Sequence, residues 1–264
     1  MATRLITLTT DFGSKDPYVG IMKGVILGIN PDAHIIDLSH GIPPQDVMAG
    51  ALVLGASVSY FPAGTIHVAV VDPGVGGNRR ALLIESEKSY FIGPDNGIFS
   101  LVLGEKTIQQ IVDLSNPAYH LRPTSATFHG RDIFAPIAAY LSLGIAAEDL
   151  GTHAQDLARI PWPAALKRDR SVEGEVIYID SFGNLITNIR ERDLPAAPSK
   201  LMVSLGSVVV RGLVPSYAWG REGAYVALIN SSALLEIALS KGSAQAASGA
   251  QIGDRVAVQE LPSL

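Results

Sequence analysis

Hydrophobic and polar residues follow two different patterns along the chain. Up to about residue 155, short apolar runs rich in β-branched residues alternate with longer stretches of helical period. Strands that alternate with helices indicate an α/β domain with a mostly parallel sheet, whose ligands gather at the carboxyl ends of the strands. We expect strands at 5–8, 34–38, 65–71, 81–85, 90–92 and 108–112, helices at 16–30, 43–60 and 131–143, and a further helical segment after residue 97.

The second pattern begins after residue 170, where short segments typical of β-strands follow one another closely. They are expected at 175–179, 185–189, 201–205, 208–210, 225–229 and 255–258, and only 233–240 has a helical pattern. Many short strands separated by glycine-bearing turns are typical of a small antiparallel barrel or sandwich. The segment 154–170 between the two patterns contains two prolines and a mixed-charge run, which is typical of an exposed linker. We therefore predict an α/β N-terminal domain at 1–158, a linker at 159–170 and an all-β barrel domain at 171–264.

Composition excludes several classes of partner. Of the 264 residues 47% are hydrophobic and 17% charged, and the net charge is -5, so the chain lacks the basic surface of a nucleic-acid-binding protein. It has no cysteine, which fits a reducing compartment, and we expect a cytoplasmic protein. Neither the apolar core of a signal peptide nor an uncharged apolar run of about 18 residues is present, so we expect no membrane partner.

The most informative segment follows the apolar run 65–71. Asp72 stands at the end of the expected strand, a glycine-rich loop follows, and Arg79 returns seven residues later. A carboxylate and a guanidinium at a strand end suit a built polar site. Two other interpretations stay open, an ordinary turn and a phosphate-binding loop, although the lysine and hydroxyl residue of a P-loop are missing. The sequence does not say whether Arg79 or Arg80 points inward.

Two further positions add to this site. His129 lies at the start of an apolar helix, so that Asp72, Arg79 and His129 are able to meet around one small polar reactant such as a water. The alternative is a structural histidine without a catalytic role. Asp11 ends the first strand, where its carboxylate suits a vicinal diol such as that of a ribose, or else an Asx-turn or a helix cap.

The barrel half carries its own polar cluster. Asp180, Phe182 and Asn184 follow an expected strand and offer a partner for an ammonium group, a stacking face and an amide for the edge of a base. This set suits an adenine, and the alternative is a hairpin turn with a buried phenylalanine.

A second polar segment precedes the expected helix at 233–240. Ser231 and Ser232 either cap that helix or help to hold a carboxylate at its N-terminus. Glu236 lies one turn inside the helix, on a face that the sequence does not fix. The other five histidines show no metal-ligand spacing, so we expect no metal and no cofactor.

Six motifs in the same order resemble one enzyme family. They are Thr9-Thr10-Asp11-Phe12-Gly13, Val71-Asp72-Pro73-Gly74-Val75-Gly76, Gly93-Pro94-Asp95-Asn96-Gly97, Phe128-His129-Gly130-Arg131-Asp132, Ser181-Phe182-Gly183-Asn184 with Thr187-Asn188-Ile189, and Asn230-Ser231-Ser232. Together they resemble the S-adenosyl-L-methionine (SAM) hydroxide adenosyltransferases, which are SAM hydrolases similar in fold to the fluorinase and chlorinase. The resemblance implies a homotrimer whose active sites lie between the N-terminal domain of one subunit and the C-terminal domain of the next.

The resemblance also implies roles for single residues. It places Asp72, Arg79 and His129 around the attacking water, Asp11 on the ribose hydroxyls, Phe182 and Asn184 on the adenine, Asp180 on the methionine ammonium, and Ser231 with Ser232 near the methionine carboxylate. The implied reaction is hydrolysis of SAM to adenosine and L-methionine by attack at the ribose C5′. Which of Asp72 and His129 accepts the proton stays open.

The halogenating relatives depart from this sequence at the expected site. They have a tyrosine in place of Asp72, a different residue at His129, and a halide-binding serine in place of Gly130, while the fluorinase has an arginine at Ser232. These differences favour water as the nucleophile. The alternatives are a SAM-dependent halogenase and a non-catalytic protein that binds adenosine or SAM.

Overall fold

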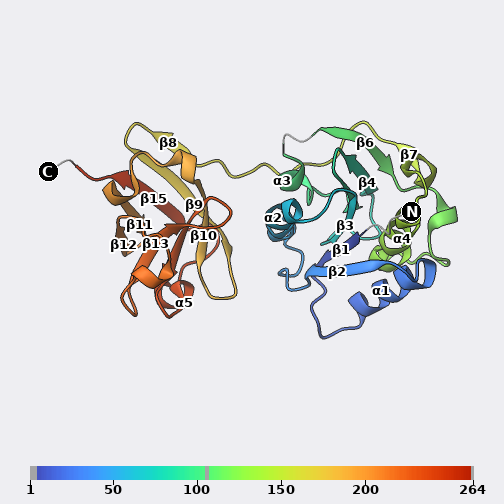
Figure 1. Ribbon diagram of the computed structural model, residues 1–264, viewed down its shortest axis with the longest axis horizontal. Coiled ribbons are helices and arrows are strands. Elements are labelled where there is room, and N and C mark those ends of the chain that lie inside the picture. Colours follow the sequence, from blue (N-terminus) through green and yellow to red (C-terminus); the bar gives the residue numbers. More distant parts are fainter. Residues whose placement is uncertain (1–4, 105–106, 263–264) are drawn as a thin grey trace. The chain divides into compact units, whose positions relative to one another are not determined.

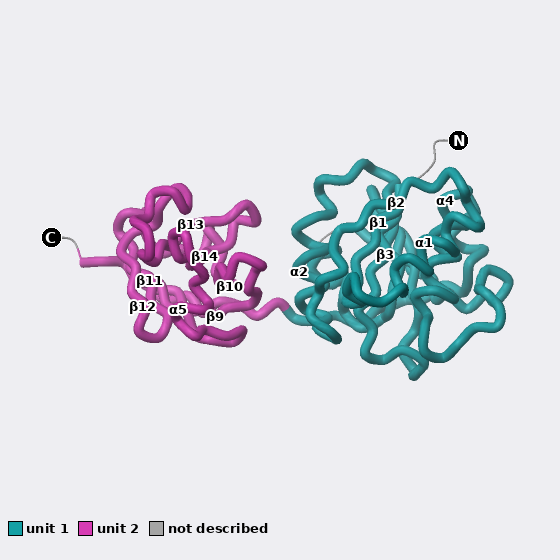
Figure 2. Tube along the Cα trace, turned by 90° about the horizontal axis from the view of Figure 1, so that it is seen from below, with its two compact units in different colours: residues 1–161 teal, residues 162–264 magenta. Residues whose placement is uncertain are grey.

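The chain divides into two compact units, residues 1–161 and 162–264 (Figure 2). Each unit has its own hydrophobic core. The structure is a computed structural model that describes residues 5–104 and 107–262. Residues 1–4 and 263–264 lie outside the described residues. The first group begins the segment in which we expected no signal peptide, and the second group ends the predicted second domain. The linker predicted at 159–170 stays a prediction, and Leu166–Arg168 within it forms a short strand.

The first unit is built on a seven-stranded sheet in the order β2-β1-β3-β5-β4-β6-β7 (Figure 1). Its strands are β1 Leu5–Thr10, β2 His34–Ser39, β3 Thr65–Val70, β4 Ala81–Ser86, β5 Ser89–Pro94, β6 Ile108–Asp113 and β7 Thr152–His153. The pairs β2–β1, β1–β3 and β3–β5 are parallel, whereas β5–β4, β4–β6 and β6–β7 are antiparallel. The predicted mostly parallel sheet is therefore a mixed one. Residues 87–88 alone join β4 to β5, and so short a connection allows only an antiparallel hairpin.

Helices cover both faces of this sheet, as predicted for an α/β domain. They are α1 Tyr18–Ile29, α2 Val47–Ser57, α3 Ser100–Leu103 and α4 Ala135–Ser142, with one turn of π-helix, η3 Gly130–Phe134, directly before α4. Met22 of α1 and Ile137 of α4 pack with Val68 of β3 in one buried cluster. Helix α2 contacts α3 on the opposite face of the sheet (Figure 1). Each fully buried side chain of this size contributes roughly 1.5–3 kcal/mol, so the cluster holds the strand ends firmly in place.

The second unit is a curved antiparallel sheet in the order β12-β11-β15-β9-β10-β14-β13, with β8 paired to β9. Its elements are β8 Leu166–Arg168, β9 Ser171–Ile179, β10 Leu185–Arg190, β11 Leu201–Leu205, β12 Val208–Arg211, β13 Tyr225–Ile229, β14 Leu234–Leu239, β15 Arg255–Glu260 and the short helix α5 Ala244–Ser248. The terminal strands β12 and β13 contact one another, so the sheet closes nearly into a barrel. The small antiparallel β architecture predicted for this half is confirmed.

Short turns of 3-10 helix connect several elements of both units. They are η1 Val58–Tyr60, η2 Pro117–Tyr119, η4 Ala147–Leu150, η5 Glu191–Asp193, η6 Pro198–Lys200 and η7 Tyr217–Trp219.

The helix predicted at 233–240 is wrong, because this segment forms β14. Asn230 makes a hairpin turn in which its Oδ1 accepts from the backbone N–H of Ser232, and Ala233 adopts a left-handed φ of 57°. Leucine and alanine favour helices, and a short apolar run does not distinguish a buried strand from a buried helix. Pairing of β14 with both β13 and β10 decides the conformation, which is a tertiary effect.

Candidate active site

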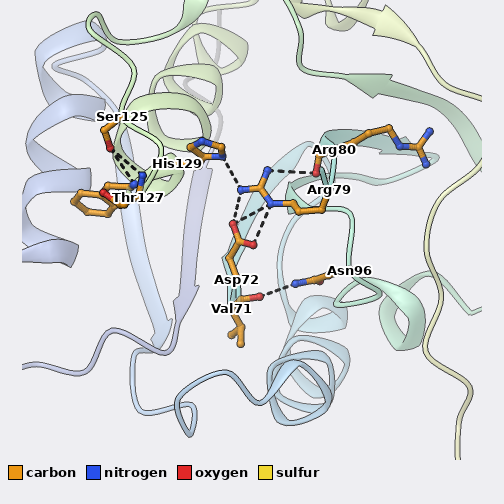
Figure 3. Close-up of polar contacts among 9 residues, drawn as sticks. Val71, Asp72, Arg79, Arg80, Asn96, Ser125, Thr127 and His129 are labelled. Carbon is orange, nitrogen blue, oxygen red and sulfur yellow. Dashed lines mark hydrogen bonds and ion pairs between the residues drawn. The ribbon is translucent and has the colours of Figure 1, made fainter. Parts of the chain in front are cut away.

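The end of β3 carries an ion pair that is almost completely buried. Arg79 donates from Nε to Oδ1 of Asp72 at 3.0 Å, and its Nη2 donates to Oδ2 of the same carboxylate (Figure 3). The Asp72 side chain is 5% exposed and that of Arg79 is 11% exposed. The guanidinium also lies over the ring of Phe134, with Cζ 5.6 Å from the ring centroid. A two-point pair of this kind fixes the orientation of both groups, not only their distance.

The structure answers which of the two consecutive arginines points inward. Arg79 turns toward Asp72, whereas the side chain of Arg80 points away from it (Figure 3). Arg80 pairs instead with Asp95 and Asp156. Arg80 also donates to the backbone carbonyl of Asp156 at 3.0 Å. Arg79 therefore belongs to the candidate site, and Arg80 ties the segment around residue 156 to the sheet.

A glycine brings the Asp72 loop against the segment that carries His129. Gly76 has a φ of 74°, a left-handed conformation that glycine adopts without strain. A Cβ at this position would lie 2.1 Å from the carbonyl oxygen of Ala126, so no other residue fits here without displacing one of the two segments. The glycine-rich loop thus serves close packing between two chain segments.

His129 completes the cluster. It directly precedes the π-helical turn η3, and its Nδ1 lies 2.7 Å from Nη2 of Arg79 (Figure 3). A guanidinium has five N–H donors and no acceptor, so Nδ1 must accept this hydrogen bond with its lone pair. The neutral imidazole therefore carries its proton on Nε2, and it presents a donor on the side away from Arg79. Arg79 thus bonds to both Asp72 and His129, and the three residues that we predicted to meet form one cluster.

The same contacts make it harder to protonate His129. Burial of the ring lowers its pKa below the ordinary value, and the positive charge of Arg79 lowers it further. The carboxylates of Asp72 and Asp132 act in the opposite direction but do not outweigh these effects. His129 is accordingly neutral near pH 7.

Hydrogen bonds inside one loop hold the backbone before His129. The hydroxyl of Ser125 accepts from the backbone N–H of Thr127 and of Phe128 (Figure 3). Asp132 is fully buried, accepts from the Ser125 N–H at 2.8 Å, and forms a two-point pair with Arg131. Residues on both sides of His129 are therefore fixed to one another.

Asp11 lies at the carboxyl end of β1, which is the parallel neighbour of β3. Its Oδ2 accepts from the backbone N–H of Gln45 at 2.8 Å. Helix α1 begins after Pro17 without a side-chain cap, so Asp11 is not a helix cap. Asp11 and Asp72 thus follow adjacent parallel strands, the position in which α/β folds bind ligands.

In the second unit the turn between β9 and β10 presents an aromatic ring to solvent. Oδ1 of Asp180 accepts from the backbone N–H of Phe182 and of Asn184, and Oδ2 accepts from the Asn184 side-chain amide at 2.9 Å. Gly183 has a φ of 79°, and a Cβ there would lie 2.0 Å from the hydroxyl oxygen of Ser243. Phe182 is 75% exposed, so the alternative of a hairpin with a buried phenylalanine is wrong. A rigid turn with an exposed ring fits a stacking surface.

Glu236 faces the same part of the unit from β14. Its side chain is buried and accepts from the hydroxyl of Tyr217 at 2.7 Å. Burial raises the pKa of Glu236, and the charge of Asp180 raises it further. Burial and the bond to Glu236 likewise raise the pKa of Tyr217. Sequence reasoning missed Tyr217, because no local pattern relates it to Glu236.

Ser231 and Ser232 occupy the hairpin turn between β13 and β14 and are exposed. Because the expected helix does not exist, the idea that a helix N-terminus holds a carboxylate at this position is wrong. The exposed hydroxyls of both serines are available for such a role, whereas the Ser232 N–H already donates to Oδ1 of Asn230.

Two kinds of feature are absent from the described ranges. Within residues 5–104 and 107–262 no three His, Asp or Glu side chains are grouped so that they could hold a metal ion. None of the helices in these ranges combines the length and the apolar character needed to span a membrane.

Comparison with protein families agrees with the motifs. Residues 6–151 match the SAM hydroxide adenosyltransferase N-terminal domain, and residues 174–257 match the C-terminal domain of the same family. The chain is 39% identical to an (R)-S-adenosyl-L-methionine hydrolase of Thermus thermophilus, with 95% of this chain and 97% of that protein covered. It is 28% identical to a fluorinase of Nocardia brasiliensis, with 90% and 91% covered.

Solved structures show the same fold. A conserved uncharacterized protein from Thermotoga maritima aligns with a TM-score of 0.90 at 33% identity, over 97% of this chain and all of that one. A conserved hypothetical protein from Thermus thermophilus aligns with a TM-score of 0.78 at 37% identity, over 98% and 100%. The resemblance inferred from the sequence is confirmed, and the chain belongs to the SAM hydroxide adenosyltransferase family.

Proposed function

We propose that this protein hydrolyses S-adenosyl-L-methionine to adenosine and L-methionine. The oxygen of a water forms a bond to the ribose C5′ while the C5′–S bond breaks and its electron pair stays on sulfur. Methionine leaves as a neutral thioether, which needs no general acid, and the water gives up one proton. The observation that carries the proposal is the contact among Asp72, Arg79 and His129 beside the end of β3. Relatives at 36–39% identity that carry the name (R)-S-adenosyl-L-methionine hydrolase support the choice of substrate.

The geometry divides the work within the cluster. Arg79 is always charged and His129 offers an N–H at Nε2, so both stabilise a hydroxide or a water that is losing its proton. Asp72 is then the proton acceptor, since its carboxylate oxygens keep lone pairs that Arg79 does not use. The guanidinium of Arg79 makes the Asp72 carboxylate a weak base. A weak base suits a reaction in which the water gives up its proton only after most of the bond to C5′ has formed.

Positioning accounts for most of the expected acceleration. A general base contributes about 10²–10⁴-fold, whereas correct placement of two reactants contributes roughly 7–11 kcal/mol. Without a metal the pKa of water is about 15.7, so in the proposed mechanism the orientation fixed by the buried pair matters more than basicity. This assigns the rigid pairing of Asp72 with Arg79 a catalytic purpose beyond stability.

The remaining polar residues would hold the substrate. Asp11 suits the two ribose hydroxyls, and the exposed ring of Phe182 suits one face of the adenine. Asn184 uses one amide N–H for Asp180 and keeps an acceptor and a second N–H for the edge of the base. Asp180 would face the methionine ammonium. Ser231 and Ser232 would bind the methionine carboxylate through their exposed hydroxyls, and Glu236 with Tyr217 would border the base.

The assembly is part of the same proposal. We propose a homotrimer in which the first unit of one subunit and the second unit of the next subunit share each active site. A cytoplasmic location, expected from the absence of cysteine, belongs to the proposal as well.

The test is to incubate the purified protein with SAM in halide-free, chelator-treated buffer and to follow products by chromatography. Adenosine and methionine in equal amounts are expected. A halogenated nucleoside formed only after halide is added would identify a halogenase instead, although Asp72 puts a negative charge where a halide would have to bind. Bound but unchanged SAM would identify a non-catalytic binding protein.

A further inference from the structure

The motif Gly93-Pro94-Asp95-Asn96-Gly97 has no part in the chemistry proposed above, yet it lies against the site. The side-chain Nδ2 of Asn96 donates to the backbone carbonyl of Val71 at 2.8 Å (Figure 3). Val71 directly precedes Asp72. The Oδ1 of Asn96 accepts from the backbone N–H of Ile98 at 3.2 Å, so the amide is engaged at both ends.

The neighbouring residue of the same turn holds the other side of the loop. The backbone N–H of Asp95 donates to the carbonyl of Arg80 at 3.0 Å. Arg80 directly follows Arg79. Asn96 is therefore bonded to Val71, the residue before Asp72. Its neighbour Asp95 is bonded to Arg80, the residue after Arg79.

Sheet topology places the turn where it can do this. Strand β5 lies between β3 and β4, and the loop 71–80 connects the carboxyl end of β3 to the start of β4. The turn at the end of β5 thus lies between the two ends of that loop. At Gly93 a Cβ would lie 2.3 Å from the carbonyl oxygen of Ala69, which shows how closely β5 approaches β3 here.

We infer that Asn96 is a positioning residue for the proposed hydrolysis, because its amide fixes the backbone from which Asp72 projects toward Arg79. The inference rests on the proposed function for its catalytic consequence but not for its geometry. An Asx-turn alone would explain only the bond from the Ile98 N–H. The bond to Val71, 25 residues away in the chain, is the part that reaches the site.

Asn96→Asp separates these two bonds. The aspartate keeps an oxygen for the Ile98 N–H but has no N–H for the Val71 carbonyl. The chain offers a matched control in Asn116, whose Nδ2 donates to the carbonyl of Asp149 at 2.7 Å and whose Oδ1 accepts from the Ala118 N–H at 3.1 Å. Asn116→Asp makes the same chemical change and breaks the same kind of bond at a position outside the cluster.

The experiment measures kcat and KM for SAM in both variants, together with the NMR resonance of the Arg79 Nε–H, assigned by its loss in Arg79→Lys. For Asn96→Asp we expect kcat to fall about 10- to 100-fold, because a displacement near 1 Å costs about that much. The KM should change less than about twofold and the Nε–H resonance should shift. Asn116→Asp should leave all three values close to those of the unmodified protein.

An unchanged kcat and an unmoved Arg79 resonance in a folded Asn96→Asp protein would overturn the inference, as would equal effects in Asn116→Asp. If the unmodified protein makes no adenosine, the proposed function fails, but the resonance still tests the positioning. If Asn96→Asp does not fold, Asn96→Ala and Asn116→Ala replace the pair. Failure of Asn96→Ala to fold as well would also overturn the inference, because Asn96 would then support the fold as a whole.

Discussion

Nη2 of Arg79 and Nδ1 of His129 lie 2.7 Å apart, although the two residues are 50 positions apart in the chain. Since the guanidinium only donates, this one distance determines which nitrogen of the histidine carries the proton. It also places the positive charge of Arg79 beside a ring that would otherwise protonate more easily. The tautomer of His129 and the ease with which it is protonated both depend on this contact.

The tautomer of His129 can be observed directly. In protein labelled with 15N-histidine, we expect neutral His129 to show a protonated Nε2 and an unprotonated Nδ1. The signal is assigned by its absence in His129→Gln. In Arg79→Met the donor is lost, and both tautomers should become populated. A protonated Nδ1 in the unmodified protein would refute the role of His129 as a donor.

The pH dependence of turnover should follow the same ring. The active form has neutral His129, so kcat/KM should fall as the pH drops through the pKa of His129. Burial and Arg79 hold this pKa below its ordinary value, so the decrease should have its midpoint below pH 6.5. The acid limb should disappear in His129→Gln and persist in His153→Gln, because His153 is an exposed residue of β7. A midpoint above pH 6.5 would contradict the expected environment of the ring.

Replacement of Asp72 by asparagine tests the proton acceptor. The amide has almost the same shape and still accepts from Arg79, but it cannot take up a proton. We expect kcat to fall by about 10²–10⁴-fold, the usual contribution of a general base. Adenosine affinity, measured by calorimetry, should change less than about threefold. The same substitution at exposed Asp32 serves as the control, and normal turnover in Asp72→Asn would show that another group accepts the proton.

Phe182→Ala should weaken nucleoside binding without loss of stability. Because Phe182 is 75% exposed, its removal leaves little cavity. Stacking of a base on an aromatic ring contributes about 1–3 kcal/mol, so the dissociation constant for adenosine should rise roughly 5- to 150-fold. Tyr60→Ala, at a ring that is 76% exposed in the first unit, should bind adenosine normally. Unchanged affinity in Phe182→Ala would remove this ring from the proposed adenine site.

Glu236→Gln should change how stability depends on pH. Folded Glu236 has a raised pKa, so between pH 4.5 and that value the folded state binds more protons than the unfolded state. Stability conferred by this group therefore decreases as the pH rises through that range. The substituted glutamine would keep an acceptor for Tyr217 and would not titrate, so the variant should gain stability relative to the unmodified protein above pH 4.5.

Urea unfolding followed by tryptophan fluorescence measures the stability of the second unit, which contains Glu236. Both tryptophans, Trp162 and Trp219, lie in the second unit. Glu222→Gln, at a glutamate whose side chain is 73% exposed, controls for the loss of one negative charge. A stability difference between Glu236→Gln and the unmodified protein that does not change with pH would argue against a titrating buried carboxyl group.

The members of the candidate site that a local pattern marks could be named from the sequence. Asp72 at a strand end and Arg79 seven residues later are recognisable without any tertiary contact, and so is His129 at the mouth of a helix. The sequence alone could not decide between Arg79 and Arg80. That choice depends on Asp95, which lies in a turn distant in the chain and pairs with Arg80. The bond between Tyr217 and Glu236 likewise arises only from tertiary packing.

The errors in the predicted fold have similar causes. Leucine and alanine in 234–239 favour a helix in isolation, and only pairing with β10 and β13 makes this segment a strand. The mixed character of the first sheet depends on the connection at residues 87–88, whose charged residues carry no strong turn signal. By contrast, the buried strand β3 was predictable because all its residues are apolar or β-branched, apart from one histidine.

The residues proposed to act on water and those proposed to hold the adenine belong to different compact units with separate cores. A mutation among the residues proposed to act on water therefore requires no change in the packing around the residues proposed to hold the adenine. If these roles hold, such modularity would let evolution exchange the attacking nucleophile in small steps while recognition of the nucleoside persists, and it would give protein engineers two units to vary separately.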